Sequence, residues 1–408
     1  MFKKTLCAAA IIASTNAAAQ VEMINVLEFG PNNTLFAADS YTGVVHAFNI
    51  TPATSASPAP AFNLENIDQL LADAMGTSRD NVRINDLQIH PDSLEAYLAV
   101  SRVDGDNYSS AIAVINQAGE VGFVDTDADH PELKIEQAPA ADFEFYRDRY
   151  QGRRLSFTDM DFYKGKLYIA GLSNADFAST LWTAGYPFDN SVAASTVEIY
   201  HDVHNQRETR APVRAMAITE LNGQDVMLAA YTCTPLVAIP LDDIKDGAHI
   251  NGKTIAELGY GNTPIDIDII FNPDFQGGGE PALFVSNKNQ MAQVIPLKNI
   301  AEAVKGEGIT SFDGNFFRRS ILGGVEYPMS GLVQTTPLGD SHIATVRRDT
   351  ENGDLELASF TKGLYMRLSD YQSEYEIPNY SYGEGQEMMQ GFHNMLKTDE
   401  GYPEYIIQ

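Results

Sequence analysis

The chain has 408 residues, of which 44% are hydrophobic and 20% are charged, so it can build the core of one large domain or two ordinary ones. Acidic residues outnumber basic ones by 55 to 27, and the net charge of −28 repels nucleic-acid phosphates and anionic lipid headgroups. This composition excludes a disordered chain and a typical nucleic-acid-binding protein. No apolar run reaches the ~18–20 residues that a membrane-spanning helix needs.

The first 19 residues have the pattern of a secretory signal peptide. Two lysines precede an apolar stretch from Leu6 to Ala13, and small residues follow up to a cleavage site before Gln20. We therefore predict a periplasmic or secreted protein, with an ordinary buried N-terminal helix as the alternative. The mature chain would keep one cysteine, Cys233, which cannot form an intramolecular disulfide.

The remaining chain repeats a unit of alternating strands separated by short turns. In the first copy we expect strands over 24–29, 34–38 and 44–50. Further copies begin near residues 84, 157, 213, 265 and 332, and the sixth is expected to end in an outer strand over 364–368. Such units bury both faces when they stack radially into a closed ring. We predict an all-β fold, a β-propeller with six or seven four-stranded blades and short helical inserts, rather than two β-sandwiches or a β-helix.

The predicted propeller domain covers residues 20–370, with inserts near 52–80 and 131–152. The first insert follows a Pro- and Ala-rich linker over 52–60, and its apolar residues from Leu64 to Met75 recur with a helical period. The second insert is expected to form a short helix over 138–150. Residues 371–408 are predicted to form a tail that either caps the ring or closes it.

The repeating units resemble those of the YVTN-type and quinoprotein-amine-dehydrogenase-β-chain-like propellers. Two stretches carry the resemblance, VLEFGPNNTLFAADSYTGVVHAFNI and LQIHPDSLEAYLAV. The resemblance covers most of residues 24–368 and concerns the pattern of the blades. It implies a β-propeller and assigns no activity, since one fold serves many functions.

Propeller topology predicts that the loops over 201–211 and 231–235 meet at one mouth of the ring. These loops carry His201, His204 and Cys233, and imidazole and thiolate are ligands that copper and zinc prefer. We predict a metal site with His204 and Cys233 as the main ligands. His201 is the third candidate, because two strand positions three apart point to opposite faces unless the chain turns. In the alternative, the imidazoles bond loop carbonyls and Cys233 packs as a small hydrophobe.

Three further residues, Tyr231, Arg210 and Glu208, are candidates for binding a ligand beside this metal. The leading hypothesis is an exported propeller that binds a small ligand or a transition metal, copper with a redox role, at its central mouth. The alternative is a non-catalytic propeller that binds a periplasmic protein partner.

A third hypothesis is a calcium-dependent, hydrolase-like propeller. Carboxylate and amide oxygens are the ligands that calcium prefers, and several occur near the starts of predicted strands: Asn85, Asp86, Asp159, Asp266 and Asp268. The sequence contains no GxSxG, HExxH or CxxCH motif. Whether the protein is an enzyme is therefore left open.

Overall fold

The computed structural model describes residues 21–52, 61–105, 107–136, 144–145, 150–274, 276–349, 352–377 and 380–406. The predicted signal peptide and nearly all of the predicted linker over 52–60 lie outside these ranges. Within them, no helix is long and apolar enough to cross a membrane.

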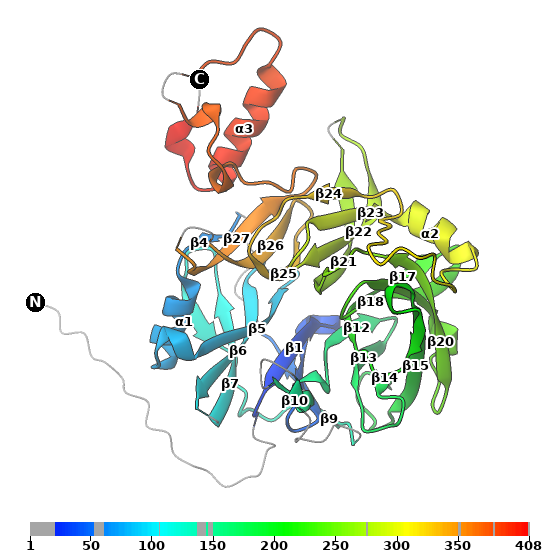
Figure 1. Cartoon of the computed structure of the whole chain (residues 1–408). Helices are drawn as coiled ribbons and strands as arrows, with labels where there is room; N and C mark the ends of the chain where they lie inside the picture. Colours follow the sequence, from blue (N-terminus) through cyan, green and yellow to red (C-terminus); the bar gives the residue numbers. More distant parts are fainter. Residues whose placement is uncertain are drawn as a thin grey trace, which may run out of the picture.

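The chain forms an all-β, propeller-like arrangement of small antiparallel sheets (Figure 1). The first sheet contains β1 (Ile24–Phe29), β2 (Thr34–Asp39), β3 (Val44–Asn49) and β9 (Glu132–Lys134). The second contains β5 (Val82–Ile89), β6 (Ala96–Asp104), β7 (Asn107–Ile115) and β8 (Val121–Phe123). The strands expected for the first repeat unit are thus confirmed to within a residue at their ends.

Two four-stranded units in the middle of the chain join at their outer edges. One contains β12 (Asp159–Tyr163), β13 (Lys166–Leu172), β14 (Ser179–Gly185) and β15 (Ala193–His201). A further short strand, β16 (Gln206–Glu208), pairs with β15. The other contains β17 (Val213–Leu221), β18 (Gln224–Tyr231), β19 (Pro235–Pro240) and β20 (His249–Glu257). The parallel pairing of β15 with β20 merges the two units into one larger sheet.

The last two sheets follow the same plan. One contains β21 (Pro264–Pro273), β22 (Gly279–Asn287), β23 (Ala292–Pro296) and β24 (Val325–Tyr327). The other contains β25 (Leu332–Leu338), β26 (His342–Arg348), β27 (Leu355–Thr361) and β4 (Asn63–Leu64).

The first strand of each unit faces the centre of the ring (Figure 1). These inner strands contact one another in the closed circuit β1, β12, β17, β21, β25, β5 and back to β1. The order differs from chain order, because the unit of β5 lies between those of β1 and β25. A hydrophobic cluster fills the space between each pair of adjacent units, which explains why the strands are apolar on both faces.

Two outer strands come from distant parts of the chain. β4 pairs with β27, and β9 pairs with β3 after the whole unit of β5 has intervened. The predicted outer strand over 364–368 is wrong. Gly363 and Tyr365 adopt φ angles of 85° and 48°, which end the strand, and β4 occupies the edge of β27 instead.

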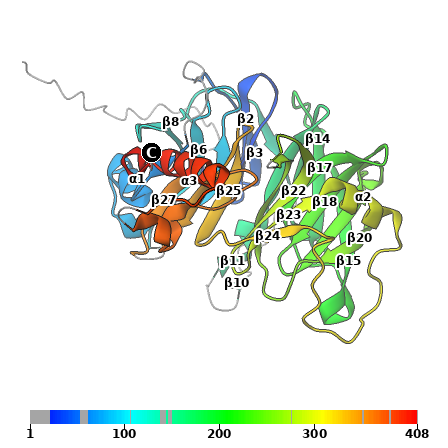
Figure 2. The same cartoon turned by 90° about the horizontal axis from the view of Figure 1, so that it is seen from above.

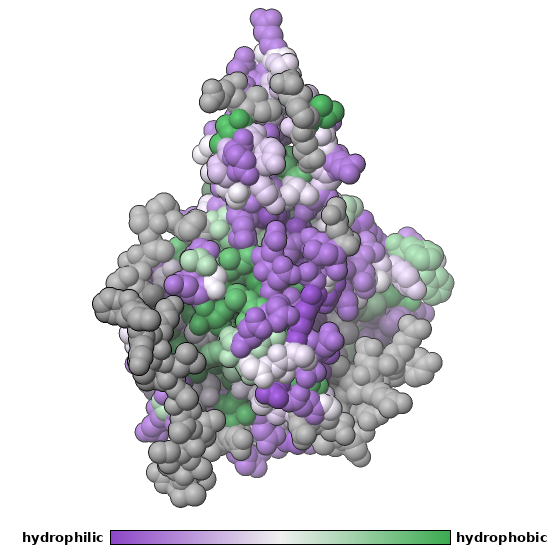
Figure 3. Space-filling view, turned by 90° about the vertical axis from the view of Figure 1, so that its left-hand side faces the viewer, coloured by the Kyte–Doolittle hydropathy of each residue, from purple (hydrophilic) through white to green (hydrophobic). Residues whose placement is uncertain are grey.

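The helices lie outside the ring. α1 (Ile67–Met75) confirms the first predicted insert helix and packs against the sheets of β5 and β27, whereas α2 (Leu297–Lys305) lies on the opposite side (Figures 1 and 2). α3 (Glu387–Asp399) belongs to the tail, which rises above the body beside β27 (Figure 1) and has both hydrophilic and hydrophobic side chains at its surface (Figure 3). The predicted second insert helix is wrong where it is described, because β10 (Glu144–Phe145) and β11 (Tyr150–Gln151) pair as a short hairpin.

Glycine at position 171, on β13, is required by close packing. A Cβ atom there would overlap the backbone carbonyl of Ser156. We predict that Gly171→Ala lowers the free energy of unfolding by about 1–3 kcal/mol. Gly185→Ala on β14, where a Cβ meets nothing within 4 Å, should change it by less than about 0.5 kcal/mol. Denaturant unfolding of both variants measures the difference, and equal effects would contradict the packing argument.

Candidate metal centre

The loops over 201–211 and 231–235 meet, as predicted. β15 ends at His201, a short 3-10 turn over Asp202–His204 reverses the chain, and β16 returns along β15. Asn205 adopts the left-handed conformation, φ 48° and ψ 45°, that this reversal requires. The turn brings the rings of His201 and His204 together, with their centroids 4.0 Å apart.

The two imidazoles converge on one carboxylate. Glu208 Oε1 lies 3.1 Å from His201 Nδ1 and 2.5 Å from His204 Nδ1. One ligand atom from each of these three residues lies within 4.8 Å of the other two, the spacing of a potential metal site. The side chains of His201, Glu208 and His204 are 1%, 16% and 50% exposed, so the cluster is open to solvent on the His204 side.

A buried hydrogen-bond chain orients His201 from behind. Its Nε2 lies 2.9 Å from the hydroxyl of Thr234, and that hydroxyl donates to the fully buried Glu257. Because the Thr234 hydrogen points to Glu257, the hydroxyl oxygen accepts the Nε2 hydrogen of His201. The other nitrogen of the ring, Nδ1, then faces Glu208. An outer partner of this kind is typical of metal-binding histidines.

The same contacts set the charges of the cluster. Burial alone would lower the pKa of His201, but its hydrogen bonds to Cys233 and Glu208 outweigh burial and raise this pKa to about 9. Burial would raise the pKa of Glu208, but hydrogen bonds from His201 and His204 lower it to about 2. Without a metal, the two groups form an ion pair at neutral pH. The contact of His201 Nδ1 with Glu208 Oε1 at 3.1 Å is poorly aligned, so this buried nitrogen has an ion-pair partner but no hydrogen bond of good geometry.

The other predicted site residues are not among the converging ligands. Cys233, in the loop between β18 and β19, is partly buried and contacts His201, but its sulfur is not among the ligand atoms that converge. Tyr231 is 1% exposed and packs in the hydrophobic core, and Arg210 is exposed in the turn before β17. The donor set is therefore two imidazoles and a carboxylate. It lies at the end of the outer strand β15, not on the inner strands that surround the predicted central mouth.

The centre of the ring is lined by carboxylates that bind the backbone of the adjacent inner strand. Asp86 on β5 accepts the N–H of Leu27 on β1 at 2.6 Å. Asp159 and Asp161 on β12 likewise accept N–H groups of β17, and Glu28 on β1 accepts one from β12. These bonds satisfy donors on strand edges that have no strand partner.

Burial raises the pKa of these central carboxylates. The pKa of Asp86 is raised to about 7, despite the opposing hydrogen bonds from Leu27 and Leu87. Burial likewise raises the pKa of Asp266 and Asp268 on β21, and adjacent carboxylates add to the shift. Among the described residues, the groups of three convergent ligands comprise only the histidine clusters. The calcium hypothesis, which needs several convergent oxygens, therefore gains no support here.

Several residues of potential function were not predicted from the sequence. Thr234 and Glu257 orient His201, and a second cluster consists of His46, His130 and Glu132. The spacing of His130 and Glu132 was an available signal, because residues two apart on a strand share a face. Their approach to His46 depends on the distant pairing of β9 with β3.

No protein-family model matches the sequence, and no curated protein matches it. Among solved structures, the chain is similar to Drosophila Semaphorin 1b, extracellular domains 1-2, with a TM-score of 0.34, 9% identity, and 84% of this chain and 87% of that chain covered. It is also similar to virginiamycin B lyase from Staphylococcus aureus, with a TM-score of 0.32, 9% identity, and coverage of 84% and 96%. Similarity of this extent assigns no function.

We predict that the ion pair of His201 and Glu208 stabilises the fold in a defined pH range. The raised pKa of His201 gives stability that is full below pH 6.5 and is lost as the pH rises to about 9. The lowered pKa of Glu208 gives stability that is full above pH 4.5 and is lost as the pH falls to about 2. Glu208→Gln should therefore cost about 1.5–3 kcal/mol near pH 5.5 and clearly less above pH 9.

Denaturant unfolding of the metal-free protein at both pH values measures this difference. Glu220→Gln, which replaces an exposed carboxylate on β17, is the control and should lack that pH dependence. A cost of Glu208→Gln that is independent of pH would contradict the ion pair.

A second pH prediction concerns Asp86. Because the pKa of Asp86 is raised in the folded protein, the free energy of unfolding that this group contributes is highest below pH 3.8 and falls as the pH rises to about 7. Asp86→Asn should therefore become more stable relative to the unmodified protein as the pH rises from about 5 to about 8. Thermal unfolding at both pH values tests this, with the exposed Asp127→Asn as control. A difference in Tm that stays constant between the two pH values argues against the raised pKa.

Proposed function

We propose that this chain is an exported, six-bladed β-propeller that binds a divalent transition-metal ion through His201, His204 and Glu208. The closed circuit of β1, β12, β17, β21, β25 and β5 supports the blade number. The convergence of two imidazoles and one carboxylate supports the metal. Export is based on the signal-peptide pattern of residues 1–19.

The donor set favours copper(II) or zinc. Three protein ligands leave a coordination position open for water or a small ligand, and His204 exposes that side to solvent. Among divalent first-row ions, copper(II) binds most tightly to nitrogen and oxygen donors. Copper at this site, with the thiol of Cys233 beside His201, is the basis for the proposed redox role.

The orientation of His201 carries the proposal. The Thr234 and Glu257 chain holds the Nε2 hydrogen, so that Nδ1 points at Glu208 from a position where it has no well-aligned hydrogen bond. A metal ion would take the place of the proton on Nδ1 and satisfy this buried atom. Since the pKa of His201 is about 9, binding at neutral pH should release about one proton for each ion.

We predict that His204→Ala removes one equivalent of bound copper(II) and that Glu208→Gln weakens binding there by about 10–100-fold. Titration calorimetry in two buffers of different ionisation enthalpy measures the affinity and the proton release together. Electron paramagnetic resonance then reports nitrogen coordination to the copper.

The matched control is His249→Ala, which removes an exposed histidine on β20 outside the cluster. It should leave stoichiometry and affinity unchanged. Equal copper binding by the unmodified protein and His204→Ala would contradict the proposed function. A strong thiolate-to-copper absorption band that disappears in Cys233→Ser would instead assign Cys233 as a ligand.

A further inference from the structure

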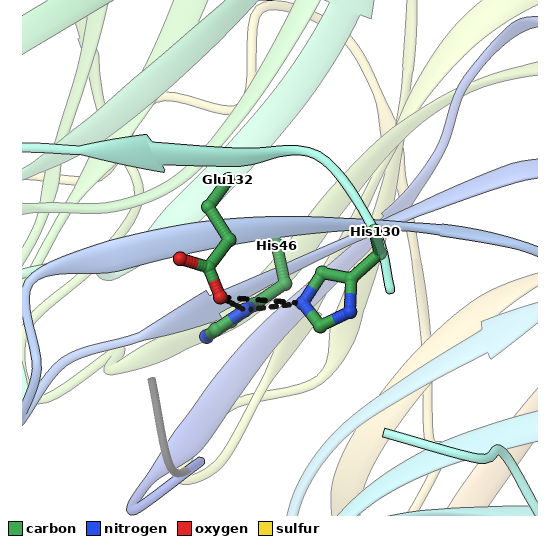
Figure 4. A group of neighbouring side chains, drawn as sticks. All are labelled: His46, His130 and Glu132. Atoms are coloured by element: carbon green, nitrogen blue, oxygen red, sulfur yellow. Dashed lines mark hydrogen bonds and ion pairs between the residues drawn. The ribbon is translucent and has the colours of Figure 1, made fainter. Parts of the chain in front are cut away.

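The second histidine cluster joins the outer strand β9 to β3. His46 lies on β3, and His130 and Glu132 lie just before and at the start of β9 (Figure 4). His46 and Glu132 are directly paired across the two strands, so their side chains share a face. The three side chains point towards one another although more than 80 residues separate His46 from His130.

Their ligand atoms have the spacing of a metal site. His46 Nδ1 lies 2.9 Å from His130 Nε2, and Glu132 Oε1 lies 3.5 Å from the first nitrogen and 3.6 Å from the second. Tetrahedral zinc at ~2.0–2.2 Å from each donor places the donors ~3.3–3.5 Å apart. The two imidazole nitrogens are closer than this, at 2.9 Å, so a small outward movement of the two rings makes room for an ion.

The surroundings of the histidines favour metal binding. His130 Nδ1 donates to the carbonyl of Ala128 at 2.6 Å, which leaves a lone pair on Nε2 facing His46. His46 is fully buried, and its Nδ1, the nitrogen that would bind the ion, faces His130 Nε2 and Glu132 Oε1. A neutral imidazole is the form that binds a metal. The side chain of Glu132 is 34% exposed and provides the open side for entry and for a water ligand.

We propose that His46, His130 and Glu132 bind a zinc ion that fastens β9 to the edge of β3. β9 has three residues and is anchored through a single neighbouring strand, and it returns only after the unit of β5 has been completed. Such a short edge strand has little stability of its own. An ion bound by residues of both strands stabilises the pairing of β9 with β3, because the ion binds the folded state.

The experiment uses the full chain with His204→Ala, so that the proposed His201 centre does not contribute. After removal of metal with a chelator, zinc alone is added and bound zinc is measured by titration calorimetry. We expect one equivalent, a raised Tm, and amide hydrogen exchange over residues 132–135 slowed by at least ~10-fold. Adding His130→Ala should abolish all three effects, whereas adding His249→Ala should leave them intact.

Glu132→Gln is the second variant, because Glu132 is partly exposed and its replacement should not prevent folding. It should weaken zinc binding by at least ~10-fold while the metal-free Tm stays close to that of the parent. The proposal is overturned if zinc does not bind the His204→Ala protein, or if bound zinc leaves exchange in β9 unchanged. If instead only the proposed His201 centre is wrong, copper binding will be the same with and without His204→Ala.

Discussion

The ring depends on acceptors for the backbone N–H groups at the inner edge of the first strand of each unit. These strands have a strand partner on one side only, and their remaining N–H groups need other acceptors. Asp86, Asp159 and Asp161 supply them by reaching to the adjacent inner strand. These acidic side chains at the centre of the ring are therefore explained by the needs of the fold, although carboxylates in a central channel first suggest a cation site.

The two convergent ligand clusters instead lie on outer strands. One is at the end of β15 and the other joins β3 to β9, and in both a turn or a distant pairing brings the donors together. In each cluster a backbone or side-chain acceptor orients one imidazole so that its second nitrogen faces the other ligands.

The sequence predicts local structure well because alternation and turn residues act over a few positions. The strands of the first unit and α1 are found where hydrophobic periodicity places them. The order of the units and the roles of β4 and β9 were not predicted, since pairing between distant segments has no local period. Likewise, the joint orientation of His201 and His204 depends on the left-handed Asn205, and the approach of His46 to His130 depends on the pairing of β9 with β3.

The most direct measurement is anomalous diffraction at the copper and zinc absorption edges from crystals of the full chain grown with each ion. We expect a copper peak ~2.0–2.1 Å from Nδ1 of His201 and from Nδ1 of His204, with Glu208 as the third protein ligand. Well-ordered side chains of all three residues with no anomalous peak between them, or a peak only at surface carboxylates, would contradict the assignment of a metal centre to this fold.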